Sequence, residues 1–237
     1  MIVSLDNAYR PECLFLPARN NTDKLIGLEI IANFVGVGSG VRTPTELITR
    51  YMTPEEELSL FKEKLALLET CQLFFIQHHL LAWINISSVI VQALLTETAL
   101  IESVKRFPFL EFTINENYPG LNTLNEHHAL VILAKRFNLV LANFGAGDAS
   151  TKAIFAGIFS RIAIDKTFVQ RRVLSPSFEP FMRAIVAQVL PHCATMMIAG
   201  VDNEETRRRV EPFGFSAMQG ALWPAVTVSR ITTLVQG

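Results

Sequence analysis

A loop containing two glycines, at residues 144–147, follows an apolar run at residues 139–142. An amphipathic segment and a second apolar run, at residues 162–164, come after the loop. This order predicts a strand, a loop, a helix and a second strand. Barrels of alternating strands and helices place their catalytic and binding residues on loops at the carboxyl ends of the strands. The Lys and Ser or Thr of a nucleotide P-loop do not follow these glycines, so they do not indicate that kind of phosphate site.

Two pairs of adjacent histidines, His78-His79 and His127-His128, could suggest metal binding because imidazole nitrogens are common ligands. Adjacent side chains point to opposite faces of a strand and lie about 100° apart on a helix. Neither pair is therefore placed to hold one ion, and we expect structural roles for these histidines. The spacing of Ser, Cys, His and Asp residues also does not suggest a nucleophilic enzyme.

The glycine loop resembles the defining loop of EAL domains, a class of cyclic-di-GMP phosphodiesterases. In that family the loop reads A-[LI]-D-D-F-G-T-G and is followed by K-I-D. Five more EAL signatures have counterparts in the same order, at residues 27–31 (G-x-E-A-L), 83–87 (N-[LIV]-S), 113–116 (E-[IL]-T-E), 198–202 (A-E-G-V-E) and 219–223 (Q-G-[YF]-L-F). Each match alone is weak, but six in order make nearly the whole chain similar to an EAL domain. The resemblance implies a (β/α)8 barrel with its site at the carboxyl ends of the strands.

The resemblance also implies a site whose metal ligands are partly lost. EAL phosphodiesterases hold divalent cations with carboxylate oxygens, and these cations activate a water molecule and offset charge on the phosphate. Glu29, Asn85 and Glu116 stand at positions that match family ligands. The pair of aspartates is replaced by Ala142 and Asn143, so one oxygen ligand is absent and the other has lost its charge.

Three further functional positions of the family are replaced. The Lys that offsets developing charge is Ala163, the first Glu of A-E-G-V-E is Ala199, and the Arg that reaches a substrate phosphate is Asn33. Removing one electrostatic stabiliser typically lowers the rate roughly 10²–10³-fold, and several that act as a unit should leave no useful activity. We therefore expect neither phosphodiesterase activity nor a bound metal or other cofactor.

Two alternatives remain open at this site. One is a non-catalytic cyclic-di-GMP receptor. This interpretation is weakened because Asn33 cannot bind a phosphate through two N–H groups as an arginine can. The other alternative is residual phosphodiesterase activity. The polar residues that match the family, Glu29, Asn85, Glu116 and Gln219, are expected to form a hydrogen-bonded remnant at the barrel mouth. A separate ligand role for these four is the competing interpretation.

Within the degenerate EAL proteins, the chain is similar to a group of anti-FlhDC factors. The segments that carry this likeness lie far apart, at residues 74–78, 114–119, 142–147, 177–181, 222–226 and 232–236. The resemblance implies a cytoplasmic regulator that binds the FlhD subunit of the flagellar activator FlhDC, keeps it off promoter DNA and helps deliver it to the ClpXP protease. Motility genes would then be repressed, and the protein would neither bind nor cleave cyclic-di-GMP. Exposed apolar residues on helix faces are the candidate contacts.

The elements that must position these residues alternate between strands and helices. Apolar runs at residues 13–18 and 24–34 flank an Asn-rich turn and predict a hairpin. Further strands are expected at residues 73–86, 107–114, 139–142, 162–164, 194–201 and 215–218. Helices are expected between them, at residues 89–104, 124–137, 177–190 and 226–235, after a helix whose Leu58, Phe61, Leu65 and Leu68 point inward. The helix at residues 177–190 is expected to place Phe178, Phe181, Ile185 and Val189 on one face.

Local signals place several helix starts. Thr43 and Thr53 each precede a proline and are expected to cap helices. Asp202 is expected to begin another helix as part of a capping box with Glu205. Together the elements predict a single α/β domain over residues 1–237, an EAL-type (β/α)8 TIM-like barrel with an antiparallel N-terminal strand.

Composition indicates which kind of partner the protein binds and in which compartment it works. The net charge of −1 gives no basic footprint for nucleic acid, and the arginines at residues 207–209 fit a solvated helix face. Three cysteines without a CxxC spacing favour a reducing compartment, and no signal peptide is evident, so a cytoplasmic protein is expected. Residues 70–96 carry no charge, but their polar residues favour a buried strand and helix over a membrane span.

Overall fold

The computed structural model describes residues 3–4, 8–38, 40, 42–43, 48–146 and 151–236. Its strands are β1 (Val3–Ser4), β2 (Ala8–Arg19), β3 (Leu25–Gly36), β4 (Arg42–Thr43), β5 (Leu81–Asn85), β6 (Leu110–Asn115), β7 (Leu139–Phe144), β8 (Phe159–Ile164), β9 (Thr195–Ala199) and β10 (Ala217–Gln219). The α-helices are α2 (Pro54–Thr70), α3 (Gln72–Gln77), α4 (Ser88–Thr96), α5 (Thr98–Lys105), α6 (Ala129–Ala134), α7 (Thr151–Phe155), α8 (Lys166–Arg172), α9 (Phe178–Val189) and α10 (Glu204–Val210). The 3-10 helices are η1 (Thr49–Tyr51), η2 (Leu121–Thr123), η3 (Leu190–His192), η4 (Glu211–Phe213) and η5 (Val228–Val235).

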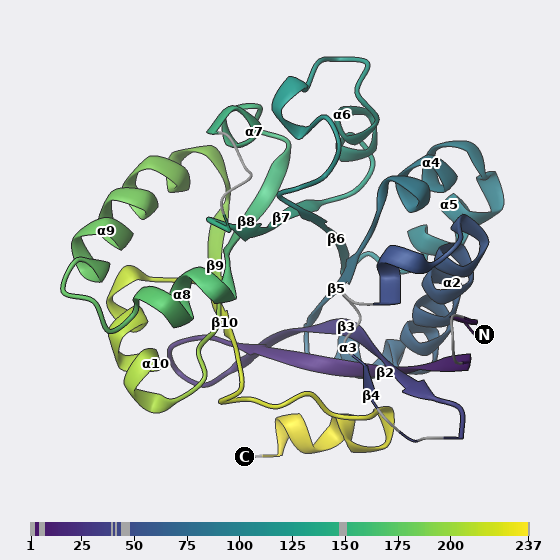
Figure 1. Ribbon diagram of the computed structural model, residues 1–237, viewed down its shortest axis with the longest axis horizontal. Coiled ribbons are helices and arrows are strands. Elements are labelled where there is room, and N and C mark those ends of the chain that lie inside the picture. Colours follow the sequence, from purple (N-terminus) through teal and green to yellow (C-terminus); the bar gives the residue numbers. More distant parts are fainter. Residues whose placement is uncertain are drawn as a thin grey trace.

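The sheet closes into a barrel (Figure 1). Strands β3 and β5–β10 run parallel to one another, and β2 completes the ring by pairing antiparallel with both β3 and β10. The predicted hairpin and the antiparallel N-terminal strand are therefore confirmed. Helices surround the strands, and the C-terminal segment returns beside β2, where Phe15 and Val226 form an isolated bridge. The fold is the predicted TIM-like barrel.

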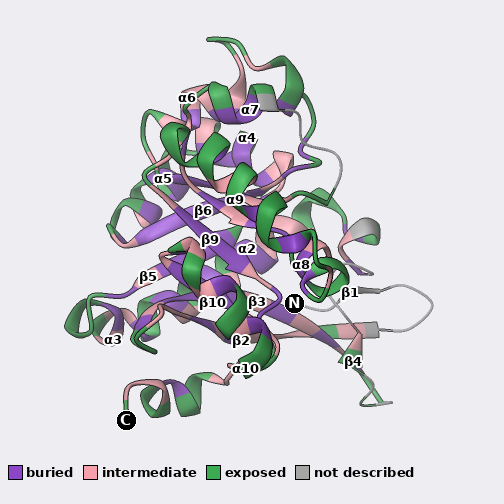
Figure 2. Ribbon diagram, turned by 90° about the vertical axis from the view of Figure 1, so that its left-hand side faces the viewer, coloured by how far each residue is buried: buried purple, intermediate pink, exposed green. Residues whose placement is uncertain are grey.

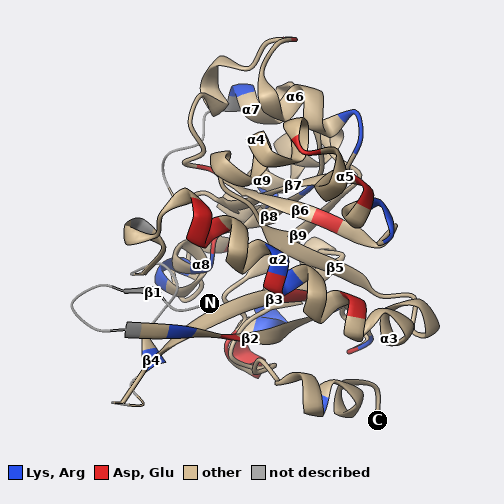
Figure 3. Cartoon of the chain, turned by 90° about the vertical axis from the view of Figure 1, so that its right-hand side faces the viewer, with Lys and Arg blue, Asp and Glu red and all other residues tan. Residues whose placement is uncertain are grey.

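Hydrophobic side chains pack on both sides of the strands. The larger layer lies between the barrel and its helices and includes Phe112, Leu28 and Leu130, all fully buried. Strands β5 to β10 are largely buried, whereas the outward faces of the helices are exposed (Figure 2). Charges of both signs are interspersed along α2 and α5 (Figure 3), as expected for solvated helix faces. The smaller layer fills the barrel interior with Ala18, Trp83, Val140, Met197 and Ala217.

A buried polar network crosses the barrel interior. Glu111 Oε2 on β6 accepts a hydrogen bond from Trp83 Nε1 at 2.9 Å and one from Arg161 Nε at 2.8 Å. Arg161 on β8 also donates from Nη1 to Thr195 Oγ1 on β9, at 2.7 Å. The side chain of Glu111 is only 4% exposed, so its charge requires these donors. The network joins four strands of the ring.

The predicted start of α2 is confirmed. The Thr53 side chain accepts from the backbone N–H of Glu56, and the Glu56 side chain accepts from the backbone of Thr53, which forms a capping box. Phe61, Leu65 and Leu68 are buried as predicted, and Leu58 packs partly buried against the same core. Thr43, the other predicted cap, lies in β4, and the helix expected after it lies outside the described residues, so that cap stays a prediction.

The predicted strand at residues 73–86 is wrong in its first part. Residues there form α3, which buries Phe75 and leaves Leu73 and Ile76 exposed. A turn in which His79 has a positive φ of 53° then leads to β5, which begins only at Leu81. A short apolar run has no periodicity that separates helix from strand, so the pattern alone misassigned it. No helix among the described residues is long and apolar enough to cross a membrane.

Two predicted helices are shorter than expected. The helix at residues 89–104 is interrupted because Glu97 leaves the helical region, with φ −95° and ψ 100°, which separates α4 from α5. The helix at residues 124–137 reduces to α6 because Asn125 Oδ1 accepts from the backbone of His127 and His128 Nδ1 accepts from that of Leu130. Such local side-chain bonds compete with helix formation. The predicted strand at residues 107–114 likewise begins later, at Leu110.

Three details of the C-terminal half also differ from the predictions. The cap of α10 is Asn203, which accepts from the N–H of Thr206, whereas Asp202 accepts from the N–H of Ala221 and from Gln170. Phe181 does not share the buried face of α9 with Phe178 and Val189 as predicted; it is 49% exposed, and Met182 occupies the buried position. The C-terminal helix is the 3-10 helix η5.

Candidate functional site

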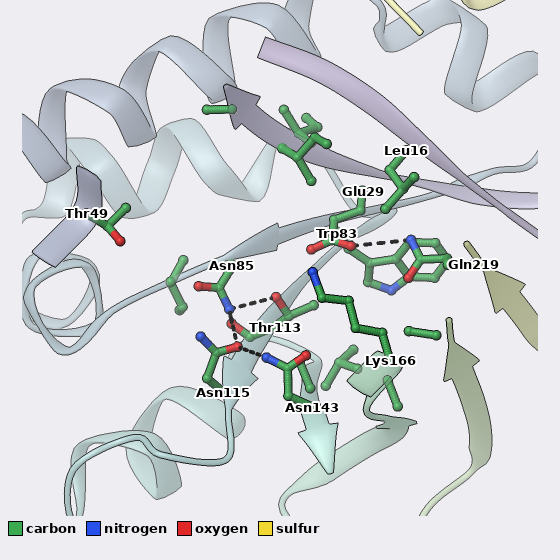
Figure 4. Close-up of a pocket in the computed structure, with 18 of the residues that line it drawn as sticks. Leu16, Glu29, Thr49, Trp83, Asn85, Thr113, Asn115, Asn143, Lys166 and Gln219 are labelled. Atoms are coloured by element: carbon green, nitrogen blue, oxygen red, sulfur yellow. Dashed lines mark hydrogen bonds between the residues drawn. The ribbon is translucent and has the colours of Figure 1, made fainter. Parts of the chain in front are cut away.

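The carboxyl ends of the parallel strands surround a cavity of about 990 Å³ at the mouth of the barrel (Figure 4). Parallel strands end at the same edge of the ring, which is why residues far apart in the chain meet there. Most predicted site positions line the cavity, namely Glu29, Asn33, Asn85, Ala142, Asn143, Ala163, Ala199 and Gln219. Glu116 is the exception, because it is buried beside the cavity rather than along its wall.

Three asparagine side chains form a hydrogen-bonded chain across the ends of β5, β6 and β7. Asn115 Oδ1 accepts from Asn85 Nδ2 at 3.2 Å and from Asn143 Nδ2 at 2.9 Å. Asn85 Nδ2 also lies 3.1 Å from both the carbonyl and the hydroxyl oxygen of Thr113. Asn143 has a φ of 58°, in the left-handed region that asparagine tolerates better than most residues. The chain is electrically neutral, and its amide nitrogens are donors.

Glu116 is directed at the glycine loop. Its Oε2 accepts a hydrogen bond of 3.1 Å from the backbone N–H of Gly145, and only 4% of the residue is exposed. Gly145 has a φ of 100°, which favours glycine. The carboxylate therefore holds the turn that follows β7. Residues 147–150 lie outside the described residues, so the second glycine of the predicted loop is not placed.

Glu29 lies on the opposite side of the mouth, on β3. Its Oε2 accepts from Gln219 Nε2 on β10 at 3.3 Å, which links the two strands on either side of β2. Lys64 on α2 also lines the cavity and is 7% exposed. Burial lowers the pKa of Lys64, and the neighbouring Cys13 and Glu29 oppose that shift. Glu29 therefore already has an amide donor and a buried amine near it.

Lys166 is a site residue that the sequence analysis missed. It is the first residue of α8, and its side chain extends into the cavity in the direction of Glu29 (Figure 4). Two features place it there: Asp165 Oδ1 caps α8 through the N–H of Phe168 at 2.8 Å, and Gly200 has a φ of 87° beside α8. A Cβ at Gly200 would come within 2.8 Å of the Lys166 carbonyl oxygen. The sequence held one signal for this residue: a lysine stands three positions after Ala163, directly after the Ile164-Asp165 pair that matches the K-I-D motif.

The donor set does not fit a pair of divalent cations. Ala142 supplies no ligand, the Asn143 amide is bonded to Asn115, and Glu116 is bonded to Gly145. The ammonium group of Lys166 also enters the cavity, where it would repel a metal ion. Across the described ranges, no group of three or more His, Cys, Asp or Glu side chains could hold a metal. Hard cations require several oxygen ligands. The remaining carboxylates, Glu29 and Glu116, are few and already accept hydrogen bonds from Gln219 and Gly145.

The histidines take part in local packing. His78 lies with its ring centroid 4.8 Å from that of Phe74, and His128 packs 6.2 Å from Tyr118 while it caps α6. His127 faces solvent, 3.5 Å from a carboxylate oxygen of Glu126. The cysteines at positions 13, 71 and 193 are free thiols.

Comparisons with known proteins agree with this geometry. The family model described as EAL domain matches residues 14–225. A protein of Salmonella arizonae named anti-FlhC(2)FlhD(4) factor YdiV is 56% identical over 236 residues, covering all of both chains, and an Escherichia coli protein named as a putative factor of the same kind is 43% identical over the same length. The crystal structure of the EAL-like domain protein YdiV superimposes with a TM-score of 0.88 at 43% identity, over 99% of this chain and 100% of that one. A complex of the PaMucR phosphodiesterase with c-di-GMP has a TM-score of 0.75 at 17% identity, over 93% and 94% of the two chains, and shares the fold.

Proposed function

The chain belongs to the EAL domain family, and on that basis we propose that it is a non-enzymatic regulator that acts against the FlhDC complex. The observation that carries the proposal is the neutral chain of Asn85, Asn115 and Asn143 at the mouth of the barrel. Metal-assisted hydrolysis of a phosphodiester requires carboxylates that hold the cations and polarise a water molecule. Neutral amides that bond to one another supply no such carboxylate.

The proposed loss of catalysis extends to the positions of Ala142, Ala163 and Ala199. All three line the cavity, and none carries a group that can bind a cation, donate a proton or offset charge on a phosphate. Asn33, at the position of the family's phosphate-binding arginine, lines the same cavity. Relatives named anti-FlhC(2)FlhD(4) factors that are 53–56% identical over their full length support the alternative role.

The finer form of the proposal follows the same resemblance. The protein binds the FlhD subunit, keeps FlhDC off promoter DNA and promotes its degradation by the ClpXP protease, so that motility genes are repressed. It acts in the cytoplasm as a single EAL-like domain over residues 1–237 without a metal or nucleotide. The overall charge of −1 supports action on a protein partner, because a direct competitor for promoter DNA would need a basic surface.

Calorimetric titration of the purified chain tests this proposal. One titration uses purified FlhDC, and the other uses cyclic-di-GMP with Mg²⁺. Saturable heat with FlhDC and none with the nucleotide is the expected result. A mobility-shift experiment with flagellar promoter DNA then checks the consequence, since adding the chain should release FlhDC from the DNA. Absence of any FlhDC binding, in either experiment, would rule the proposal out.

A non-catalytic receptor for cyclic-di-GMP is the second candidate. The cavity of about 990 Å³ favours it, because the Lys166 ammonium and several amide groups face a space large enough for a ligand. The nucleotide titration decides between the two. Micromolar binding that is lost in Lys166→Ala would establish the receptor, and the anti-FlhDC role would then have to be linked to the nucleotide or abandoned.

A further inference from the structure

The amine of Lys64 lies in the wall of the barrel mouth without a polar partner. Lys64 is in the second half of α2, is only 7% exposed and lines the cavity of about 990 Å³. Across the residues that the structure describes, its nitrogen makes neither a hydrogen bond nor an ion pair. The nitrogen is not completely enclosed, because the one enclosed side-chain polar atom without a hydrogen bond in that part of the chain is Asn21 Oδ1. A solute in the cavity can therefore reach the amine.

Few charged groups surround this amine. Helix α2 packs against β2, α3 and α4, and the two helices carry no charged side chain. The groups that act on Lys64 are the Cys13 thiol on β2 and the Glu29 carboxylate on β3, and Glu63 acts on the thiol. Burial outweighs these two groups and lowers the pKa of Lys64, which increases the neutral fraction of the amine. A neutral lysine amine has a free electron pair and acts as a nucleophile.

Lys64 differs in this respect from the two buried or half-buried carboxylates of the site. Glu29 accepts a hydrogen bond from Gln219, and Glu116 accepts one from the backbone of Gly145. A buried amine without such a partner lowers the stability of the fold, since its charged form loses hydration and gains nothing in return. Titratable groups that are buried in this way and open to a cavity are typical of functional sites. The amine is therefore better explained by a ligand than by packing.

Two features of the cavity wall indicate what kind of ligand the amine meets. Leu60 and Phe61 precede Lys64 by four and three positions on α2, so they share its face of the helix, and both line the cavity. Carboxylates also outnumber ammonium groups in the lining, with Glu29, Glu57, Asp165 and Asp202 against Lys64 and Lys166. This excess of negative charge disfavours a small anion beside the amine. An uncharged molecule with an apolar body fits the wall better.

We propose that Lys64 is a covalent binding site for small, uncharged aldehydes that enter the cavity at the mouth of the barrel. The Lys64 nitrogen forms a bond to the carbonyl carbon, and the electron pair of the C=O double bond moves to the oxygen. One proton passes from nitrogen to this oxygen. The resulting hydroxyl group leaves with the second proton of the nitrogen as water, and a C=N imine remains. One amine and one aldehyde thus give one imine and one water, without an oxidant or a reductant.

The aldehyde site goes beyond the proposed action on FlhDC. The reaction involves only the chain and the aldehyde, so it can be measured without any protein partner. Failure of the aldehyde to react leaves the proposed function standing, and failure of FlhDC to bind leaves the aldehyde site standing.

Reductive trapping of the imine tests the inference. The full-length chain is incubated at pH 7 with propanal and cyanoborohydride, which reduces the imine to a stable secondary amine, and peptide mass spectrometry measures the label on each lysine. Lys62 is exposed on the same helix and supplies the matched control. We expect Lys64 to be labelled at least about fivefold faster than Lys62, because more of its amine is neutral. Equal or slower labelling of Lys64 overturns the inference.

Two variants and an unfolded sample show whether the folded cavity is responsible. In the uptake of label by the whole chain, Lys64→Met should remove the fast phase and Lys62→Met should retain it. In urea the two lysines should react at equal rates, because both amines are then hydrated. A fast phase that survives in Lys64→Met, or a preference for Lys64 that persists in the unfolded chain, contradicts the inference.

A charged aldehyde tests the expected preference for uncharged ligands. Glyoxylate is similar in size to propanal but carries a carboxylate, which the acidic groups of the lining should repel. The ratio of Lys64 to Lys62 labelling corrects for the different reactivity of the two aldehydes. We expect this ratio to be at least about threefold lower with glyoxylate than with propanal. An equal or higher ratio would mean that the cavity accepts small anions at Lys64, and the assignment to uncharged aldehydes would be wrong.

Discussion

The side-chain amide of Asn143 donates a hydrogen bond of 2.9 Å to Asn115 Oδ1, so the ends of β7 and β6 are joined through neutral groups. The same oxygen accepts from Asn85, which extends the link to β5. In a metal-dependent site, carboxylates at such strand ends repel one another until a cation binds between them. Here the strand ends hold together without one. The three amides therefore join the strand ends at the mouth without a charge.

Restoring a carboxylate at Asn143 should therefore destabilise the protein. In Asn143→Asp the donor is replaced by an acceptor that faces Asn115 Oδ1, and we expect a loss of about 1–3 kcal/mol at neutral pH. Facing an acceptor raises the folded-state pKa of the new carboxyl, and its protonation restores a donor, so the loss should shrink as the pH falls toward about 4, the usual Asp value, and be absent below it. Urea unfolding of variant and wild type between pH 3 and 8 measures both effects. Equal stability at neutral pH would mean that the amide chain does not hold the strand ends.

Lys64 should cost stability at neutral pH. Its folded-state pKa is lowered by burial, so the unfolded chain binds more protons between the folded pKa and the usual value of 10.5. The contribution of Lys64 to the free energy of unfolding therefore rises as the pH increases from its folded-state pKa to about 10.5. Lys64→Met removes both the cost and the rise, and we expect it to raise the free energy of unfolding on the order of 1 kcal/mol at pH 7.

Lys62 supplies the control for this prediction, because it is an exposed lysine on the same helix, α2. Lys62→Met should leave the free energy of unfolding and its pH dependence unchanged. Denaturant unfolding between pH 7 and 10 distinguishes the variants, and each is compared with the wild type at the same pH. A Lys64→Met variant that is less stable than wild type at every pH would show that the amine has a necessary partner.

The buried pair of Glu111 and Arg161 should show strong coupling. Arg161→Met leaves the Glu111 carboxylate buried with only the Trp83 donor, and we expect a loss of about 3–5 kcal/mol. Adding Glu111→Gln removes the uncompensated charge and should recover a large part of that loss. A double-mutant cycle by urea unfolding measures the coupling. Additive losses would mean that the two side chains act independently.

Much of the mouth could be predicted because it depends on strand ends. The resemblance to EAL domains put Glu29, Asn85, Asn143 and Gln219 at the barrel mouth, and all four line one cavity because the carboxyl ends of parallel strands meet at one edge. The same argument fails for Glu116. It follows β6 as expected, but the backbone N–H of Gly145 turns it out of the cavity, and that bond depends on the shape of a turn.

Lys166 was missed for a different reason. A lysine at the first position of a helix faces solvent unless the helix begins over a cavity, and the Asp165 cap and the close approach of Gly200 decide where α8 begins. Phe181 and α3 were misassigned because apolar periodicity does not reveal which apolar side chains remain exposed. Long-range packing decides those positions.

Restoring the family residues at four positions should not restore hydrolysis. The variant Ala142→Asp/Asn143→Asp/Ala163→Lys/Ala199→Glu regains the lost groups, but Lys166 still extends into the cavity and Glu116 is still bonded to the glycine loop. We expect no cleavage of cyclic-di-GMP in the presence of Mg²⁺ or Mn²⁺. Chromatographic separation of the linear product from cyclic-di-GMP measures the cleavage. Adding Lys166→Ala and Asn33→Arg removes the cation that extends into the cavity and supplies a phosphate ligand, so activity should appear only in this second variant. Activity in the four-fold variant would show that Lys166 does not obstruct the site and that the replaced side chains alone account for the lost chemistry.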